Sequence, residues 1–310
     1  MAKGALTIGV HHDDNGPAKE GRGSGRPKTV SIIVLNWNGK RLLKECLTSL
    51  SDTQYSAFRV VAVDNGSTDG SAEMVRREFP SVELIETGRN FGYPGGNNIG
   101  LRYVMEKHSP DYVLLLNNDT RVIDPQWLSW LVKRFESDEG IGIVGCLLVT
   151  PTGTAQRVGL EVLPGVHLPF FNREMRRPAL GCSLIRREVL EKVGLFDEGY
   201  FPMLFEDVDY IKRASRASFK AVLERRSVLL HYGSATIGKR PRLSMLYGYR
   251  RNATRYLRKY YWYLLILSIL VSYAGCLAMA FESSRTSRGE AFSRAIESTT
   301  RGIARGLLDE

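Results

Sequence analysis

The sequence predicts an α/β fold with a mostly parallel central sheet, followed by a helical C-terminal region. From residue 29 onward, short β-branched and apolar runs alternate with helix-like segments, and this order produces parallel strands joined by helices. The apolar runs are nearly continuous, as expected when both faces of each strand are buried. Beyond residue 238 the apolar positions follow a helical spacing instead, which predicts helices.

The elements follow one another regularly along the chain, without an internal repeat. The runs that predict strands are residues 30–35, 60–63, 82–85, 112–116 and 141–149. The helix-like segments between them lie near residues 40–50, 70–78, 96–107 and 125–135. A further helix-like run, 208–217, is opened by the acidic stretch at 205–209.

Composition limits the classes of protein that the chain can belong to. With 310 residues, of which 43% are hydrophobic and 25% charged, it can bury a sizeable core in one large domain plus an appendage. The cysteines are scattered without a C-x-x-C pair, so neither a zinc site nor a disulfide framework is indicated, and a reducing compartment fits. They are Cys46, Cys146, Cys182 and Cys276.

The first 28 residues lack the apolar core of a signal peptide and are rich in Gly, Lys, Arg and Asp. We expect a disordered leader there. Within it, the run His11-His12-Asp13-Asp14 is interpreted as solvated polar residues, with a metal site as the alternative.

Polar clusters follow four of the predicted strands. The first strand is followed by Asn36-Trp37-Asn38, the second by residues 64–70, the third by 89–98 and the fourth by Asn117-Asn118-Asp119. In open parallel sheets, ligands bind beyond the carboxyl ends of the strands, so the four clusters predict one site. Taken singly, each cluster has another explanation, because Asx and Gly residues favour turns and helix caps for local reasons.

As a set, these motifs resemble those of family-2 inverting glycosyltransferases, especially the rhamnosyltransferase-like branch. The similar stretches are residues 30–38, 63–70, 89–100, 116–120, 194–198 and 205–210, together with His231, and the resemblance covers residues 30 to about 260. It implies a GT-A fold in residues 29–238, with a donor-binding half at 29–120 and an acceptor-binding half at 121–238. It also implies transfer of a sugar from a nucleoside diphosphate donor.

The resemblance implies a divalent cation, Mg²⁺ or Mn²⁺, against the donor diphosphate. Carboxylate and phosphate oxygens are natural ligands for such a hard cation. Asp119 takes the place of the last acid of the family's D-x-D motif, and His231 stands where the family can complete the metal shell. Asn117 stands where many relatives have the first Asp, so a hydrogen bond or a water-mediated contact is expected from it and metal affinity is expected to be modest.

The other site residues are also carried over by position. Asp64 is expected to accept hydrogen bonds from the base or ribose, with Asn36 nearby. The loop 90–97 is expected to close over the donor, its glycines permitting close backbone approach. The donor-binding residues of this loop are Asn90, Gly92, Gly96 and Asn97.

An inverting transfer needs a base that takes the proton of the acceptor hydroxyl. The family pattern maps this role to Asp207, with Glu206 orienting a donor or acceptor hydroxyl and Asp209 structural. The alternative explanation is that these acids only stabilise the first turn of a helix through its dipole.

The C-terminal region, 239–310, combines a basic stretch with an apolar one. Between Lys239 and Lys259 lie eight Lys or Arg and no acid, and residues 260–281 carry no charge. This pattern is typical of a juxtamembrane segment before a stretch long enough to span a bilayer. A membrane hairpin, an interfacial segment and a soluble core helix remain alternatives.

Two helical faces are predicted around this apolar segment. An aromatic stripe, opposite Arg250, Arg251, Arg258 and Lys259, contains Met245, Tyr249, Asn252, Tyr256 and Tyr260. The alternative for this stripe is a helix packed on the preceding domain. In the tail, Arg294, Arg301 and Arg305 accompany an apolar face that suits a surface-lying helix and contains Phe292, Ile296, Thr299, Ile303 and Leu307.

The predicted partners are a nucleoside diphosphate sugar (dTDP-rhamnose or a UDP- or GDP-sugar), a lipid-linked or cell-surface glycan acceptor, and the membrane. A homo-oligomer is left open, and nucleic acid is disfavoured because the basic-aromatic stripe leads into the apolar segment. The catalytic domain is expected to face the cytosol, where nucleotide sugars are made. Three N-glycosylation patterns, at Asn65, Asn118 and Asn252, are interpreted as chance matches.

Two other function classes remain open. A nucleotidyltransferase would make the sugar nucleotide itself, and the Glu206-Asp207 pair and His231 argue against it. A non-catalytic nucleotide-sugar binder is mildly supported by Asn117, which stands in the place of an acid.

Overall fold

The computed structural model describes residues 26–156, 178–233, 242–266, 269–270, 273 and 288–308. The polar run at 11–14, and all of the predicted leader except residues 26–28, lie outside the described residues.

The first half of the fold confirms the predicted alternation of strands and helices. Its elements are β1 (Val30–Asn36), α1 (Lys40–Leu50), β2 (Phe58–Asp64), α2 (Ser71–Glu78), β3 (Glu83–Glu86), α3 (Gly92–Lys107) and β4 (Tyr112–Asn117). Helix α3 begins at Gly92, four residues before the expected start. Proline is tolerated in a first helical turn because the N–H groups there have no partner within the helix, so Pro94 does not delay the start.

The second half contains the remaining strands of the sheet. Its elements are β5 (Thr120–Val122), α4 (Trp127–Glu136), β6 (Ile141–Val149), β7 (Cys182–Arg186), α6 (Arg187–Val193), the 3₁₀ turn η1 (Glu198–Tyr200), α7 (Glu206–Arg216) and β8 (Lys220–His231). Strands β5, β7 and β8 were not predicted. The first two are short, and Glu224, Arg225 and Arg226 interrupt the apolar pattern of the third.

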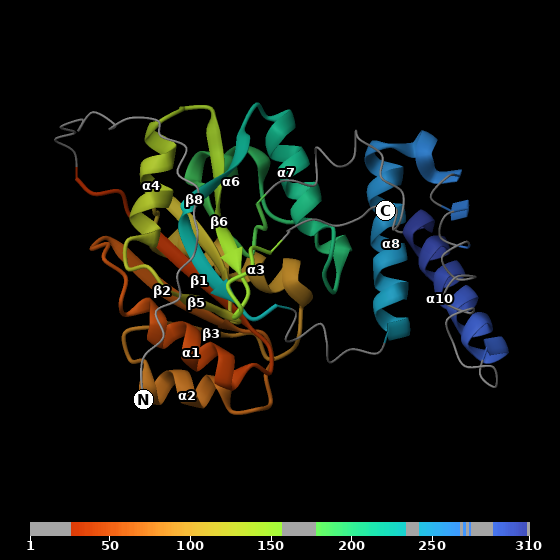
Figure 1. Ribbon diagram of the computed structural model, residues 1–310, viewed down its shortest axis with the longest axis horizontal. Coiled ribbons are helices and arrows are strands. Elements are labelled where there is room, and N and C mark those ends of the chain that lie inside the picture. Colours follow the sequence, from red (N-terminus) through yellow and green to blue (C-terminus); the bar gives the residue numbers. More distant parts are fainter. Residues whose placement is uncertain are drawn as a thin grey trace.

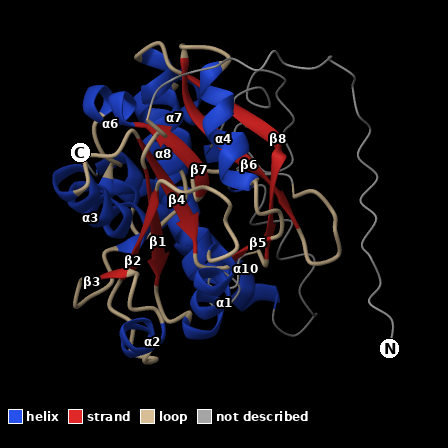
Figure 2. Ribbon diagram, turned by 90° about the vertical axis from the view of Figure 1, so that its left-hand side faces the viewer, coloured by secondary structure: helices blue, strands red, loops and turns tan. Residues whose placement is uncertain are grey.

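All eight strands form one sheet, in the order β3-β2-β1-β4-β7-β6-β8-β5, and Figure 2 shows it twisted, with helices on both faces. Strands β3, β2, β1 and β4 are parallel, as expected. However, β7 pairs antiparallel with β4 and β6, and β5 pairs antiparallel with β8. The prediction of a mostly parallel sheet is therefore wrong for the second half, and the sheet is mixed.

Two layers of helices bury the two faces of the sheet. Helices α1, α2 and α4 pack on one face through side chains such as Leu47, Met74 and Trp127. Helices α3, α6 and α7 pack on the other through Leu101, Val189 and Tyr210. This double coverage explains the apolar strand sequences, and the described thiols, Cys46, Cys146 and Cys182, are buried and free within it.

Helix α8 (Arg242–Tyr260) stands beside the sheet domain and packs against it (Figure 1). Its buried Tyr256 joins a third apolar cluster with Tyr200 and Phe205. The aromatic stripe therefore faces the sheet domain, which was the alternative explanation for it. On the same side, the buried carboxylate of Asp209 accepts hydrogen bonds from Lys259 Nζ at 2.7 Å and Arg213 Nε at 2.8 Å.

Helix α10 (Arg288–Leu308) packs along α8 through small residues. A Cβ at Gly302 would lie 2.7 Å from Tyr247 O, and one at Gly306 would lie 2.3 Å from Arg251 O. The buried face of α10 thus includes these glycines and Thr299, whereas Leu307, predicted on the same apolar face as Thr299, is exposed. Two glycines four residues apart allow close contact between helices, so α10 turns its glycine face toward α8.

The predicted apolar segment 260–281 is only partly covered by the described residues. The 3₁₀ turn η3 (Trp262–Leu264) follows α8, and residues 267–268, 271–272 and 274–281 lie outside the described part. Among the described residues, no helix has the length and apolarity needed to cross a membrane.

Candidate functional site

The carboxyl ends of β1, β2 and β4 bring the first polar side chains together. In the parallel register, Asn36 lies opposite Asp64, and Asn117 lies opposite the residue before Asn36. The Asp64 carboxylate accepts hydrogen bonds from Ser67 N at 2.8 Å and from Asn36 Nδ2 at 3.4 Å. Asn118 Nδ2 donates to Asn36 Oδ1 at 2.6 Å. These side chains therefore form one fixed polar network at the edge of the sheet.

Asn65 holds the turn that leads into α3. Its Nδ2 donates to Gly92 O at 2.9 Å and to Asn90 Oδ1 at 3.2 Å, and its Oδ1 accepts from Phe91 N at 3.0 Å. Gly92 has a φ of +72°, and a Cβ there would lie 2.7 Å from Pro202 O. Only glycine fits this close approach between the two loops. The sequence motif contained Asn65, but its role as a loop clamp required the fold.

Gly96 and Asn97 make internal contacts. A Cβ at Gly96 would lie 2.5 Å from Leu35 Cδ1, so its absence lets α3 sit close to β1. Asn97 is 1% exposed, and its Nδ2 donates to Tyr93 O at 3.0 Å. In this structure both residues lie within α3 and determine how it packs. Asn90 lies in the turn before α3, and Gly92 is the first residue of the helix.

The pairing of β5 with β8 brings Asp119 and His231 together. Thr120 lies opposite His231 in the antiparallel register, and Tyr232 N donates to Asp119 O at 2.9 Å. As a result, Asp119 Oδ1 lies 3.2 Å from His231 Nε2. The two side chains are separated by more than a hundred positions in the chain, and β8 was absent from the sequence prediction.

Gln156 fixes the orientation of the His231 ring, and sequence reasoning missed it. Gln156 Nε2 donates to His231 O at 2.8 Å, which leaves its Oε1 facing His231 Nδ1 at 2.7 Å. Because an amide oxygen only accepts, Nδ1 carries a proton and Nε2 is the atom directed at Asp119. Buttressing of this kind is typical of histidines that bind metals.

Asp119 and His231 could supply two ligands to a divalent cation. Within the described ranges, no group of three or more His, Cys, Asp or Glu side chains is placed to hold a metal ion. Nearby, Asn117 N donates to Gly181 O at 2.7 Å, and a Cβ at Gly181 would lie 2.4 Å from the Asn117 side-chain oxygen.

Glu206 and Asp207 begin α7 as an acidic pair, in which Glu206 is buried and Asp207 is half-buried. Burial raises the pKa of Glu206 well above its ordinary value, and the charge of Asp207 raises it further. Burial also raises the pKa of Asp207, whose Oδ1 accepts from Val208 N at 2.7 Å. Glu206 Oε2 is buried without a hydrogen-bond partner among the described residues. An unsatisfied buried carboxyl oxygen of this kind is typical of a functional site.

The acidic pair affects the pKa of Tyr93, and Asp119 affects that of Cys182. Burial raises the pKa of the Tyr93 hydroxyl well above its ordinary value, and the charges of Glu206, Cys182 and Asp207 raise it further. The pKa of the Cys182 thiol is raised chiefly by burial, and Asp119 also contributes. Cys182 therefore lies within electrostatic reach of both Tyr93 and Asp119.

The three N-glycosylation patterns are inaccessible in the fold. Asn65, Asn118 and Asn252 are 2%, 7% and 0% exposed. Their burial agrees with the interpretation of chance matches.

Comparison with known proteins identifies relatives of this chain. Residues 31–194 match the model of the family described as glycosyl transferase family 2. The O-antigen biosynthesis protein RfbC of Myxococcus xanthus is 33% identical over 233 residues, which are 68% of this chain but only 18% of RfbC. The chain thus spans less than a fifth of that relative. The N-acetylglucosaminyl-diphospho-decaprenol L-rhamnosyltransferase of Mycobacterium tuberculosis is 27% identical over 243 residues, 68% of this chain and 78% of that enzyme.

The fold has relatives among solved structures. One of them is the mannosyltransferase PcManGT of Pyrobaculum calidifontis, solved with GDP-Man and Mn²⁺. It superposes with a TM-score of 0.58 at 19% sequence identity, and the superposition covers 92% of this chain and 88% of the PcManGT chain. At this identity the likeness concerns the fold, which is of the GT-A type.

A first prediction concerns the proton on the acidic pair. Because the pKa of Glu206 lies well above 4.5 in the folded protein, the folded state retains a proton that the unfolded chain releases, and stability falls as pH rises above 4.5. Glu206→Gln removes this dependence. Its free energy of unfolding should therefore exceed that of the parent by an amount that grows from about pH 5 to about pH 8. Urea unfolding at several pH values measures this.

Glu188→Gln is a matched control in the first turn of α6, where Lys192 lowers the pKa of Glu188 through a hydrogen bond. It should show no such growth with pH. A constant difference between Glu206→Gln and the parent would contradict the prediction.

Proposed function

Because the chain belongs to glycosyl transferase family 2, we propose that it transfers a sugar from a nucleoside diphosphate sugar to an acceptor hydroxyl, with inversion at the anomeric carbon. This agrees with the family resemblance of its sequence motifs. The observation that carries the proposal is the acidic pair Glu206–Asp207, whose pKa values are raised by desolvation and whose preceding loop is joined to α3 by the hydrogen bond from Tyr93 N to Pro202 O.

The donor nucleotide is proposed to lie over the carboxyl ends of β1, β2 and β4. Asp64 there is held by Ser67 and Asn36, so its carboxylate is fixed before any ligand arrives. Fixed acceptors suit the hydroxyls of a ribose or the N–H groups of a base. Asn90 and Gly92 would border the donor from the turn before α3, and Asn117 would donate a hydrogen bond from the end of β4.

Asp207 is proposed to act as the base. It would take the proton of the acceptor hydroxyl while the oxygen attacks the anomeric carbon on the face opposite the diphosphate. Burial raises the pKa of Asp207 and thereby strengthens it as a proton acceptor. Glu206 would orient a hydroxyl through the carboxyl oxygen that has no hydrogen-bond partner among the described residues. Asp209 points into the contact between α7 and α8 instead.

Asp119 and His231 are proposed to hold a divalent cation, Mg²⁺ or Mn²⁺. The residues fit such an ion, because a carboxylate oxygen and an oriented imidazole nitrogen lie 3.2 Å apart. When bound, the cation would neutralise charge on the diphosphate leaving group. Two protein ligands are few, so the donor phosphates would complete the shell.

The acceptor is proposed to be a lipid-linked or cell-surface glycan. The support comes from the relatives, one of which is an O-antigen biosynthesis protein and another a rhamnosyltransferase acting on a decaprenol diphosphate. The L-rhamnosyl group in the name of that relative supports rhamnose as a candidate sugar, and dTDP-rhamnose stands beside UDP- and GDP-sugars as a proposed donor.

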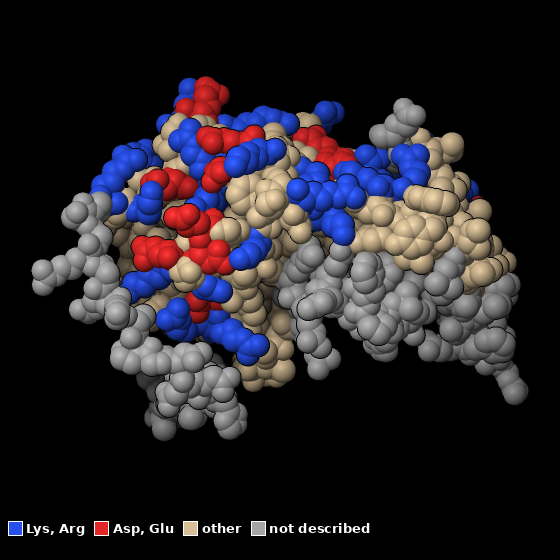
Figure 3. Space-filling view, turned by 90° about the horizontal axis from the view of Figure 1, so that it is seen from above, with Lys and Arg blue, Asp and Glu red and all other residues tan. Residues whose placement is uncertain are grey.

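We also propose that the region around α8 and α10 rests on a membrane surface, with the catalytic domain in the cytosol. Figure 3 shows Lys and Arg side chains gathered where α7 adjoins α8, and there Lys212 and Arg216 lie over the rings of Tyr261 and Tyr260. Next to them, Trp262 is 72% exposed and Ile266 is 75% exposed. Cationic and aromatic side chains beside exposed apolar ones suit a lipid interface.

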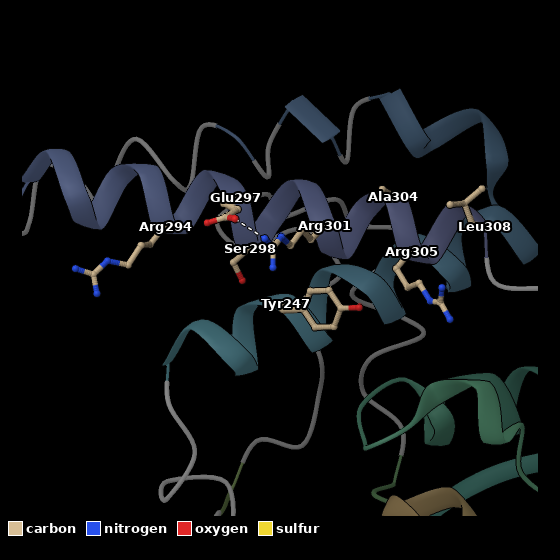
Figure 4. A pocket seen from close by; sticks show the side chains of 8 residues that line it. All are labelled: Tyr247, Arg294, Glu297, Ser298, Arg301, Ala304, Arg305 and Leu308. Carbon is tan, nitrogen blue, oxygen red and sulfur yellow. Dashed lines mark hydrogen bonds and ion pairs between the residues drawn. The ribbon is translucent and has the colours of Figure 1, made fainter.

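A basic groove adds to this surface. It has a volume of about 770 Å³ and lies between α8 and α10 (Figure 4), with Tyr247 facing it from α8. Arg294, Arg301 and Arg305 line it from α10, together with one acid, Glu297, which forms an ion pair with Arg301. This excess of positive charge suits anionic headgroups.

The base is tested by Asp207→Asn. We expect the transfer rate to fall about 10²–10⁴-fold, the usual contribution of a general base, while donor binding is retained. Rates with a panel of nucleotide sugars, together with calorimetric donor binding, measure this, and the product should have the inverted configuration. A retained configuration or an unchanged rate would refute the mechanism, and release of pyrophosphate would indicate a nucleotidyltransferase.

The cation is tested by Asp119→Asn and by chelation, both of which should abolish transfer. Gln156→Leu should weaken Mn²⁺ binding about 10–100-fold, because it frees the His231 ring while leaving both ligands in place. Calorimetric titration with Mn²⁺ provides a readout that does not depend on activity. Full activity in excess chelator would contradict the proposal.

The membrane surface is tested by fractionation and by vesicle binding. We expect detergent, but not salt, to extract the full chain from membranes, and we expect the chain to bind vesicles that contain anionic lipid. The double variant Trp262→Ser, Ile266→Ser should bind them more weakly, whereas Ile123→Ser, which alters an apolar residue 44% exposed elsewhere, should not. Recovery of the parent in the soluble fraction at ordinary salt would refute this proposal.

A further inference from the structure

The loop between η1 and α7 sets the position of the acidic pair. Residues 201–205 lead directly into Glu206 and Asp207. Leu204 has a φ of +80° and Phe205 has a φ of +74°. Both values lie in the left-handed region, which residues other than glycine disfavour. Residues in this conformation persist only when their surroundings hold them in place.

The side chain of Asn252, in α8, holds the backbone of this loop. Its side-chain Nδ2 lies within hydrogen-bond distance of three carbonyl oxygens: Tyr200 O at 3.0 Å, Met203 O at 2.9 Å and Leu204 O at 3.0 Å. An amide nitrogen has two hydrogens, so at least one of them is shared. Because Asn252 is completely buried, water cannot replace these bonds if the amide is removed.

Neighbouring contacts fix the same loop from both sides. From α8, Arg251 Nη1 donates to Phe201 O at 2.7 Å. From the first turn of α3, Tyr93 N donates to Pro202 O at 2.6 Å. The loop is therefore held between α8 and the segment that borders the proposed donor site.

A second contact between α7 and α8 limits how far the pair can move. The buried Asp209 carboxylate accepts hydrogen bonds from Lys259 Nζ at 2.7 Å and Tyr260 Oη at 2.8 Å, both from the end of α8. Asp209 lies two positions after Asp207, so the ion pair fixes the body of α7 while Asn252 fixes its entry.

We propose that Asn252 is a positioning residue for the transfer reaction: by holding three carbonyls of the strained loop, it keeps Glu206 and Asp207 at the place where they meet the acceptor. Helix α8 is then a part of the active site as well as a support for the domain. This inference rests on the function proposed above.

The test compares Asn252→Ala with Thr254→Val. Thr254 is also buried on α8, but it faces α10, where a Cβ at Gly306 would lie 2.8 Å from Thr254 Cβ. We expect Asn252→Ala to lower kcat at least about tenfold with the KM for the donor within about twofold of the parent, since a small displacement of a reacting group slows transfer without removing donor contacts. Thr254→Val should leave both unchanged.

Hydrogen exchange supplies a readout that does not depend on activity. Amides of residues 200–207 should exchange faster in Asn252→Ala than in Thr254→Val. If Asn252→Ala does not fold, Asn252→Ser, which keeps a shorter donor, takes its place beside Thr254→Val and should show the lower kcat and the faster exchange of residues 200–207.

Three results would overturn the proposal: equal losses of kcat in both variants, faster loop exchange with an unchanged kcat, or a raised KM with an unchanged kcat. Asp207→Asn separates this failure from failure of the proposed function. If that variant keeps full transfer, the proposed mechanism fails, while the exchange experiment still shows whether Asn252 holds the loop.

Discussion

The parallel pairing of β1 with β2 on one side and β4 on the other is the constraint on which the proposed site depends. Parallel strands end at the same edge of a sheet, so three polar segments that are distant in the chain arrive side by side. The register places Asn36 opposite Asp64 and next to the end of β4. Helices cover both faces of these strands. A shift of one residue in the strand register would place apolar side chains where the polar ones now stand, at the carboxyl ends of the strands, and is strongly disfavoured. The network of Asn36, Asp64 and Asn118 is therefore set by the core beneath it.

The second half of the sheet adds groups that the parallel half cannot supply. Strand β7 runs antiparallel between β4 and β6, and its preceding residue Gly181 gives room for the Asn117 side chain. The antiparallel pairing of β5 with β8 brings His231 to Asp119, and Gln156 orients the histidine ring. A family-2 glycosyltransferase fold of this kind thus combines a rigid parallel half with a mixed half whose strand ends carry reactive side chains.

Burial gives the acidic pair its chemical character. A solvated carboxylate in the first turn of a helix would be stabilised as an anion by the helix dipole. Glu206 and Asp207 begin α7, but Glu206 is buried and Asp207 half-buried, and desolvation raises the pKa of both. The loop that holds them there has an unfavourable backbone conformation, which α8 supports through Asn252. Local strain and burial are thus maintained by a helix that follows the sheet domain in the chain.

The sequence by itself determined the five predicted strands, the helices between them and the identity of the motifs, because apolar periodicity and turn residues act locally along the chain. It also indicated Asp119, in a motif within the residues 31–194 that match the family, and Glu206, Asp207 and His231 through the same resemblance. Only the tertiary structure decided the mixed sheet, since β5 and β7 are too short to show a period and charged residues interrupt β8. It alone assigned Gln156, Asn65 and Asn252, whose polar side chains bind backbone groups far away in sequence. Such hydrogen bonds leave no periodic pattern, because they depend on which segments the packed core brings together.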